Sequence, residues 1–448
     1  MGSPNFNTHD NLKVFDKPLN INHFHTRRLI LKESILGLHE RLIAVNNFNK
    51  QFSKEFGKTG KKIGHTLKIR KPNAFTVREG PTMGTPSAVD EETTMIRFGS
   101  QLGVDFNLSS VEQRLEFRNL SHQVIQPSMS RLSAEVERRA LQMIHQIPNA
   151  HVCRHKGELD FRNLLQADQL LNSHLTPRNE PRVALLNPDD QMNFVSSIKG
   201  QFEDSGKVSR GYREGLLGTT AGYRFYVHTM IPDYIDPVTP IVLRARETDT
   251  TTLPRFIKRK EKDGEMMTLL RDVQSALTRV PTDENIRIGQ VFYANPFVWC
   301  HRETKQPLDK RVQLVVRDLE KDGDGKILKI WLTPDLVFEG PRQNAVVNPA
   351  RTTEPFHLES ILAEAEEHKG RKYRQSLLFH RDAFCYLSKA LPKVGGTHRS
   401  SMESFDGINA RFISDYDTEK DVMLHRFDIY IGFGLLNPHY ACRILTPV

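Results

Sequence analysis

Residues 57–86 predict a long β-hairpin with almost no apolar face of its own. Leu67 and Ile69 alternate with basic residues, and polar, glycine-containing segments stand on either side of them. Isolated two-stranded ribbons are only marginally stable in water. We therefore expect this hairpin to lie on another surface, and that requirement limits the folds the chain can adopt.

The length of the chain predicts more than one packed unit. Its 448 residues exceed the roughly 250–300 residues at which a single hydrophobic core stops growing. Hydrophobic residues make up 38% and charged residues 26% of the sequence. These fractions are near the globular average once glycine is counted as apolar, so wholesale disorder is excluded.

The net charge of +9 is compatible with contact to an acidic polymer but does not require it. The densest basic run, residues 255–262, is diluted by Glu261 and is followed by Asp263 and Glu265. Mixed charges of this kind are typical of a solvated loop. A basic nucleic-acid-binding protein is therefore the alternative function, not the first one.

The four cysteines are far apart and form no C-x-x-C pair, so neither a zinc site nor a dense disulfide framework is indicated. The first thirty residues do not resemble a signal peptide. No later stretch approaches the roughly 20 apolar residues of a membrane span. We expect a protein that folds in a reducing cytoplasm and has no membrane partner.

The first part of the sequence predicts two helices and a strand. Residues 29–45 carry apolar side chains at helical spacing, and residues 102–108 alternate between apolar and polar. A long helix follows, which Pro127 should kink or interrupt. Its apolar stripe comprises Leu132, Val136, Ala140 and Ile144.

The remainder predicts an α+β fold, because residues 161–222 alternate helical patterns with a short apolar strand. Residues 233–348 are interpreted as an inserted, β-rich unit. The charged segment 354–374 predicts a helix, and residues 427–435 show the clearest strand alternation of the chain. The strand patterns of the inserted unit are at 290–299, 312–316 and 327–332.

No pattern predicts a catalytic, cofactor-binding or metal-binding residue. Glu320, Asp322 and Asp324 match the opening of a calcium loop, but Trp331 occupies the position of the bidentate glutamate. The Asp-Gly pairs at 322–325 better fit a hairpin turn. No zinc-binding helix, P-loop or nucleophile-elbow motif is present. We expect no enzyme, and a metal-dependent hydrolase is a distant alternative.

Four regions of the sequence, taken in order, carry a family resemblance. They are 56–80; 103–107 with Pro127-Ser128-Met129-Ser130; 186–223, including Leu186-Asn187-Pro188 and Tyr212-Arg213-Glu214-Gly215; and 378–384 with 432–444. Together they resemble the major capsid (coat) proteins of short-tailed double-stranded DNA bacteriophages, in the HK97-fold branch with an inserted domain. They cover a little over half of the chain.

The resemblance implies an α+β fold of the HK97 type, with an extended β-hairpin loop, a long spine helix, peripheral and axial domains, and an inserted β-rich domain. The implied divisions are 1–50, N-terminal arm and helix; 51–98, extended loop; 99–160, peripheral domain with spine helix; 161–232, first part of the axial domain; 233–348, inserted domain; and 349–448, remainder of the axial and peripheral core.

The same resemblance implies a non-enzymatic subunit that forms hexamers and pentamers and encloses DNA in an icosahedral head, without a cofactor. The implied partners are copies of itself, a scaffolding protein, a portal protein, packaged double-stranded DNA on the inner face and a decoration protein. The implied location is the virion, assembled in the cytoplasm of the bacterial host.

Four residues of the predicted hairpin are the candidate inter-subunit contacts: Lys68, Arg70, Arg78 and Glu79. A basic, polar loop without a core of its own is suited to a neighbouring subunit in a closed symmetric shell. We expect the basic side chains to meet carboxylates of that neighbour. The alternative is that they are only solvated.

Overall fold

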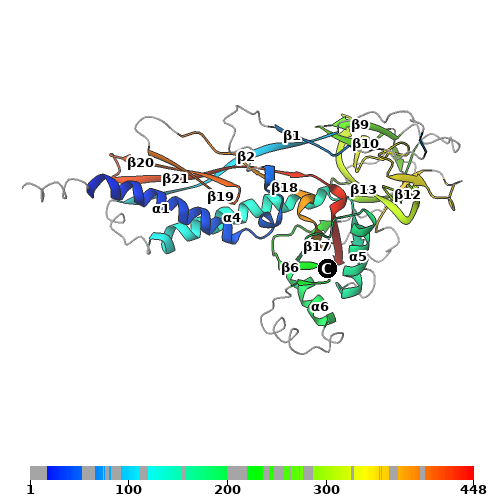
Figure 1. Ribbon diagram of the computed structural model, residues 1–448, viewed down its shortest axis with the longest axis horizontal. Helices are drawn as coiled ribbons and strands as arrows, with labels where there is room; N and C mark the ends of the chain where they lie inside the picture. Colours follow the sequence, from blue (N-terminus) through cyan, green and yellow to red (C-terminus); the bar gives the residue numbers. More distant parts are fainter. Residues whose placement is uncertain are drawn as a thin grey trace, which may run out of the picture.

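The structure is a computed structural model of the chain. It describes residues 18–52, 66–73, 75, 80–81, 92–109, 120–153, 158–198, 219–235, 242–245, 257–262, 264–271, 273–275, 286–323, 327–352, 354, 356–362, 372–393 and 399–448. This described part has an α+β fold, as predicted, with three sheets arranged in an elongated molecule (Figure 1).

The first sheet, which we call the long sheet, runs along the length of the molecule. Its strands are β1 Thr66–Arg70, β2 Thr93–Ser109, β18 Phe384–Ser388, β19 Arg399–Phe405, β20 Ile408–Asp417 and β21 Val422–Leu435. The order is β1-β2-β21-β20-β19, and β18 also pairs with β21. The strands predicted at 102–108 and 427–435 are confirmed, and they pair with each other in antiparallel register.

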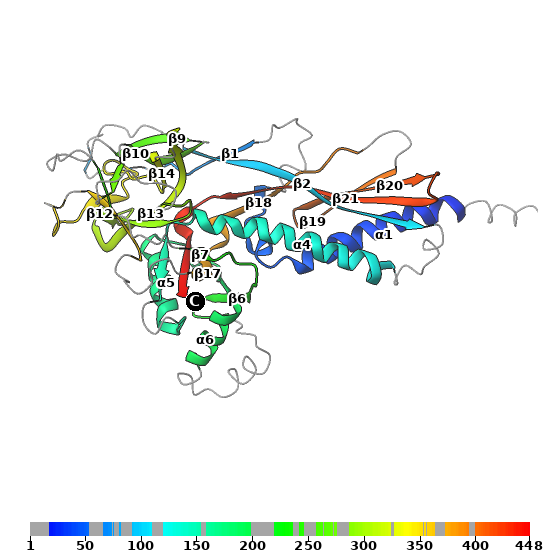
Figure 2. The ribbon, with the colours of Figure 1, turned by 180° about the vertical axis from the view of Figure 1, so that it is seen from behind.

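Two long helices cover one face of the long sheet, as Figures 1 and 2 agree. They are α1 Pro18–Arg41 and α4 Gln126–Leu141; short helical turns lie at η1 Val45–Asn47, η3 Ser121–Ile125 and η4 Gln142–Gln146. The apolar stripe of α4 packs in one core with Leu31 and Ile35 of α1 and with Phe427 of β21. The interruption expected at Pro127 is the π-helical turn η3, after which the proline occupies the first turn of α4.

The second sheet, the compact sheet, joins segments from distant parts of the chain. Its strands are β3 Ala150–Val152, β4 Arg182–Leu186, β5 Thr219–Thr220, β6 Tyr223–Val227, β7 Tyr234–Ile235, β17 Lys372–Phe379 and β22 Ala441–Pro447. Helices α5 Phe161–Ser173 and α6 Pro188–Ile198 pack on one face through Leu164 and Phe194. The turns η6 Arg381–Ala383 and η7 Pro438–Tyr440 lead to and from the long sheet.

The third sheet, the β8–β16 sheet, is formed by one continuous part of the chain between β7 and β17. Its strands are β8 Val242–Ala245, β9 Ile257–Lys262, β10 Glu265–Arg271, β11 Val273–Ser275, β12 Val291–Cys300, β13 Pro307–Lys321, β14 Ile327–Thr333, β15 Ala345–Val347 and β16 His357–Ser360. Phe292, Leu314 and Leu358 belong to a separate core of this sheet. The strands predicted near 290–299, 312–316 and 327–332 are confirmed, and β13 and β14 form the predicted hairpin.

The helix predicted at 354–374 is wrong in the part that the structure describes. Residues 357–360 form β16, which pairs with β12 on one side and β8 on the other. Leu358 is fully buried there, whereas Glu359 contacts Arg311. The charged residues belong to the half-exposed side of a strand, so pairing within the sheet overrides the local helical propensity.

One buried carboxylate connects helix α4 to the segment that follows α1. Glu137 of α4 accepts hydrogen bonds from the backbone N–H groups of Ala44 and Val45, at 3.1 and 3.2 Å. His228, after β6, lies 3.2 Å from the same carboxylate. The side chains of Glu137 and His228 are almost fully buried, so these polar groups depend on one another.

We predict that Glu137→Gln lowers the free energy of unfolding by about 2–4 kcal/mol, because an amide cannot satisfy both backbone donors and His228 together. Chemical denaturation measures the change. Glu135→Gln on the same helix is the matched control. Glu135 pairs with Arg138 and Arg139 in a half-exposed position, where we expect a loss of about 0–1 kcal/mol. Equal losses would contradict the special role of Glu137.

Candidate functional site

Two of the four candidate contact residues lie on β1, which pairs with β2. Lys68 and Arg70 are both exposed, two residues apart in β1, and so project from the same face of the strand. Leu67 and Ile69 face the other way and pack beside Ile96. Arg78 and Glu79, the other two candidates, lie outside the described residues.

The strand β1 packs on another surface, as expected of the predicted hairpin, but its partner is β2, which lies beyond the predicted residues 57–86. The apolar side of β1 joins a small core that includes Cys385 and Leu387 of β18. Because side chains alternate along a strand, the charged side of β1 faces away from that core. The hairpin therefore offers two basic side chains on a supported strand.

The β8–β16 sheet fixes the base of the hairpin. Arg342 lies 2.7 Å from the carboxylate of Glu92, immediately before β2, and both side chains are largely buried. Lys71 lies 3.9 Å from the same carboxylate. A side chain on Gly264, which has φ +81°, would collide with Met95 of β2. Lys71, Glu92 and Arg342 line a crevice of about 380 Å³, which His439 also lines.

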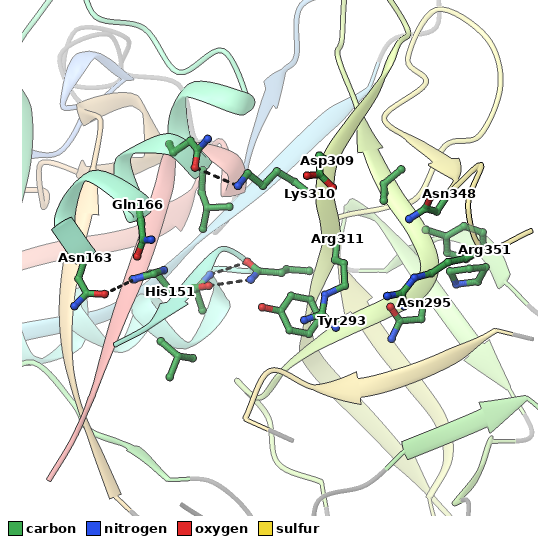
Figure 3. A pocket seen from close by; sticks show the side chains of 18 of the residues that line it. His151, Asn163, Gln166, Tyr293, Asn295, Asp309, Lys310, Arg311, Asn348 and Arg351 are labelled. Atoms are coloured by element: carbon green, nitrogen blue, oxygen red, sulfur yellow. Dashed lines mark hydrogen bonds between the residues drawn. The ribbon is translucent and has the colours of Figure 1, made fainter. Parts of the chain in front are cut away.

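A larger crevice of about 740 Å³ separates α5 from strands β12 and β13 (Figure 3). Its polar groups contact one another across the gap and along its walls. His151 Nε2 lies 3.0 Å from Asn163 Oδ1, and Lys310 donates to Gln169 Oε1 at 3.1 Å. The guanidinium of Arg311 stacks on Tyr293 at 3.7 Å. Polar groups that pair with one another in this way are typical of a packing contact between two units, not of a ligand-binding site.

At the floor of this crevice a side-chain amide joins two sheets. Gln313 of β13 accepts from the backbone N–H of Ala150 and donates to its carbonyl oxygen, both at 2.9 Å. Gln313 is buried. The amide therefore occupies the position on β3 that a neighbouring strand would take in a sheet.

Two buried cysteines and one buried histidine have structural roles. Burial raises the pKa of the thiols of Cys385 and Cys442 to about 12, so both stay protonated and unreactive at neutral pH. His380, also buried, accepts from the backbone N–H of Asp382 and caps η6. Within the described ranges, no three His, Cys, Asp or Glu side chains are grouped to hold a metal ion.

Among the described helices, none is both long and apolar enough to cross a membrane.

Sequence reasoning missed the residues that fix the hairpin base and the floor of the crevice. Glu92 and Arg342, like Gln313 and Ala150, are distant in sequence and form no motif with a fixed spacing. Glu92, Arg342 and Gln313 are ordinary polar residues in their local context, and Ala150 contributes only its backbone groups. Only the pairing of distant segments gives them a role.

Comparisons with known proteins give no family by sequence: no protein-family model matches, and no curated protein matches at a significant level. Among solved structures, the chain is similar to one from Mycobacterium phage Che8, with TM-score 0.41, 11% identity and 90% of each chain covered. It is also similar to the capsid of the cyanophage P-SCSP1u, with TM-score 0.39, 9% identity, and 86% of this chain and 84% of that chain covered.

A virus-like particle from Pyrococcus furiosus is similar over 92% of this chain and 98% of that chain, with TM-score 0.34 and 9% identity. Likeness at this level does not by itself decide function. The fold class rests on the described elements: two long helices beside an elongated sheet, and a compact sheet with two further helices, form an α+β fold.

We predict that Arg342→Gln loosens the hairpin base, because Glu92 then keeps only the more distant Lys71 as a charged neighbour among the contacts described above. Faster amide exchange in β1 and the start of β2, measured by mass spectrometry, is expected, with a stability loss of about 1–3 kcal/mol. Arg351→Gln is the control, since its pair with Glu354 spans 3.6 Å and is exposed. The prediction fails if both variants change exchange in β1 equally.

Proposed function

We propose that this chain is the major capsid protein of a tailed double-stranded DNA bacteriophage, a non-enzymatic subunit of an icosahedral head. The observation that carries the proposal is the hairpin of β1 and β2. It continues the long sheet, is supported on its apolar side, and presents Lys68 and Arg70 outward. A supported polar edge of this kind is suited to contact with a neighbouring subunit.

The three sheets are assigned to the parts of such a subunit as follows. The long sheet with α1 and α4 is the peripheral domain, and α4 is its spine helix. The compact sheet with α5 and α6 is the axial domain. The β8–β16 sheet is the inserted domain; its separate core and its origin in one continuous chain segment support this assignment, and β16 extends the unit to Ser360.

Assembly as hexamers and pentamers places many copies of each contact in one particle. In this proposal Lys68 and Arg70, with Arg78 and Glu79 of the same loop, contact charged groups of the adjacent subunit. A scaffolding protein, a portal protein, packaged DNA on the inner face and a decoration protein complete the set of partners. Assembly takes place in the host cytoplasm, and the mature protein resides in the virion.

Co-expression of the chain with its scaffolding protein, followed by negative-stain microscopy, is expected to give closed particles of uniform size. Free monomers alone under these conditions would refute the proposal. A nucleic-acid-binding protein would behave differently, because its affinity for DNA would fall steeply with salt and it would form no empty shells.

We predict that the double charge reversal Lys68→Glu with Arg70→Glu raises the concentration needed for assembly by about tenfold or more. A change of about 1.4 kcal/mol per subunit contact is sufficient for a tenfold shift. Light scattering against protein concentration measures it. Lys393→Glu with Lys420→Glu, both exposed and outside the hairpin, is the matched control. Equal assembly of the hairpin variant and the wild type would exclude these side chains from the contact.

A further inference from the structure

A stack of three buried aromatic rings joins the β8–β16 sheet to the rest of the protein. His174 is the residue that ends α5, His439 lies in η7, and Trp299 belongs to β12. The two imidazole centroids are 4.3 Å apart, and the indole meets both rings edge-on at 5.1 and 5.2 Å. All three residues are buried, so the stack is part of the contact between the units.

Neither imidazole is placed to carry a charge. His174 Nε2 and His439 Nδ1 are buried and make no hydrogen bond to a described residue. The charged groups outside the stack that act on the rings are cationic: Arg302, after β12, acts on both, and Lys71, after β1, acts on His439. Three carboxylates line the adjoining crevice, together with the cationic Lys305. Glu92 pairs with Arg342 and Glu265 with Arg317, and the third is Asp335, after β14. None of the three is among the charges that shift the two imidazoles.

We propose that the His174–His439–Trp299 stack is an acid-sensitive joint, which holds the β8–β16 sheet against the core at neutral pH and releases it when the two histidines take up protons. Two adjacent imidazolium ions beside Arg302 would repel one another in a buried position without a counter-charge. Opening the joint exposes both rings to water and removes that cost. The hairpin base, which the same sheet fixes through Arg342, is released with it.

The direction of the pH dependence follows from burial. Burial lowers the pKa of His174 to about 3, with Arg302 as a second cause. Burial likewise lowers the pKa of His439 well below its ordinary value, and His174, Arg302 and Lys71 act in the same direction. The opened state therefore binds protons more readily than the closed state, so the closed joint is favoured above about pH 6.5 and weakens as the pH falls.

A third histidine acts at another part of the same contact. His145 of η4 lies against Gly289, just before β12, where an added Cβ would come within 2.9 Å of the His145 Cβ. Burial lowers its pKa to about 4, and Arg443 contributes in the same direction. His145 is left unchanged in the test, so that any remaining pH response is assigned to it.

The protein contains two tryptophans, so Trp331→Phe leaves Trp299 as the local fluorescent probe in the full-length chain. Fluorescence and far-UV circular dichroism are recorded from pH 7.5 to 4.5. We expect a reversible change in Trp299 emission below about pH 6.5 while the circular dichroism is retained. The opening constant should rise by up to about 100-fold per pH unit, because two protons are taken up.

In the same background, His174→Phe with His439→Phe keeps the aromatic packing and removes both titrating rings, so the change in Trp299 emission should be lost or reduced to the part due to His145. His122→Gln, at an exposed position of η3, should leave the response intact. If the double variant does not fold, His439→Gln alone is used, and the slope should fall to about tenfold per pH unit. An unchanged response in these joint variants, or no response of Trp299 before global unfolding, would overturn the proposal.

Discussion

The pairing of β21 with three other strands is the constraint on which the rest of the structure depends. β21 pairs with β2 and β20 along its length and with β18 near its end. Gly432 lies at a point of close approach between β21 and β2, because a Cβ there would lie 2.8 Å from the carbonyl oxygen of Arg97. The helical layer packs on this sheet, the hairpin leaves from it, and β18 and η7 connect it to the compact sheet.

The sequence allowed the strongest periodic elements to be predicted, because their pattern follows directly from which face is buried. The alternation at 427–435 and the helical stripe from Leu132 to Ile144 both end in the same core. The segment around Leu358 was misinterpreted, because its charged neighbours suit a helix locally and become the exposed side of a strand only when β8 and β12 flank it. The strand itself depends on partners that are distant in sequence.

The candidate site could be predicted only in part for the same reason. The basic alternation in the hairpin predicts exposed Lys68 and Arg70, and both are exposed. The support beneath them could not be predicted, since Arg342 and Glu92 meet only when the β8–β16 sheet packs beside the hairpin. Local patterns thus predicted what the surface presents, whereas the residues that orient it required the tertiary structure.

The amide of Gln313 has a consequence for solubility. β3 lies at an edge of the compact sheet, and an edge strand offers free N–H and C=O groups on which another chain can add a strand. Gln313 bonds both backbone groups of Ala150, the first residue of β3, so these groups are not open to an added strand. The protein is thereby protected at this edge from the addition of a foreign strand.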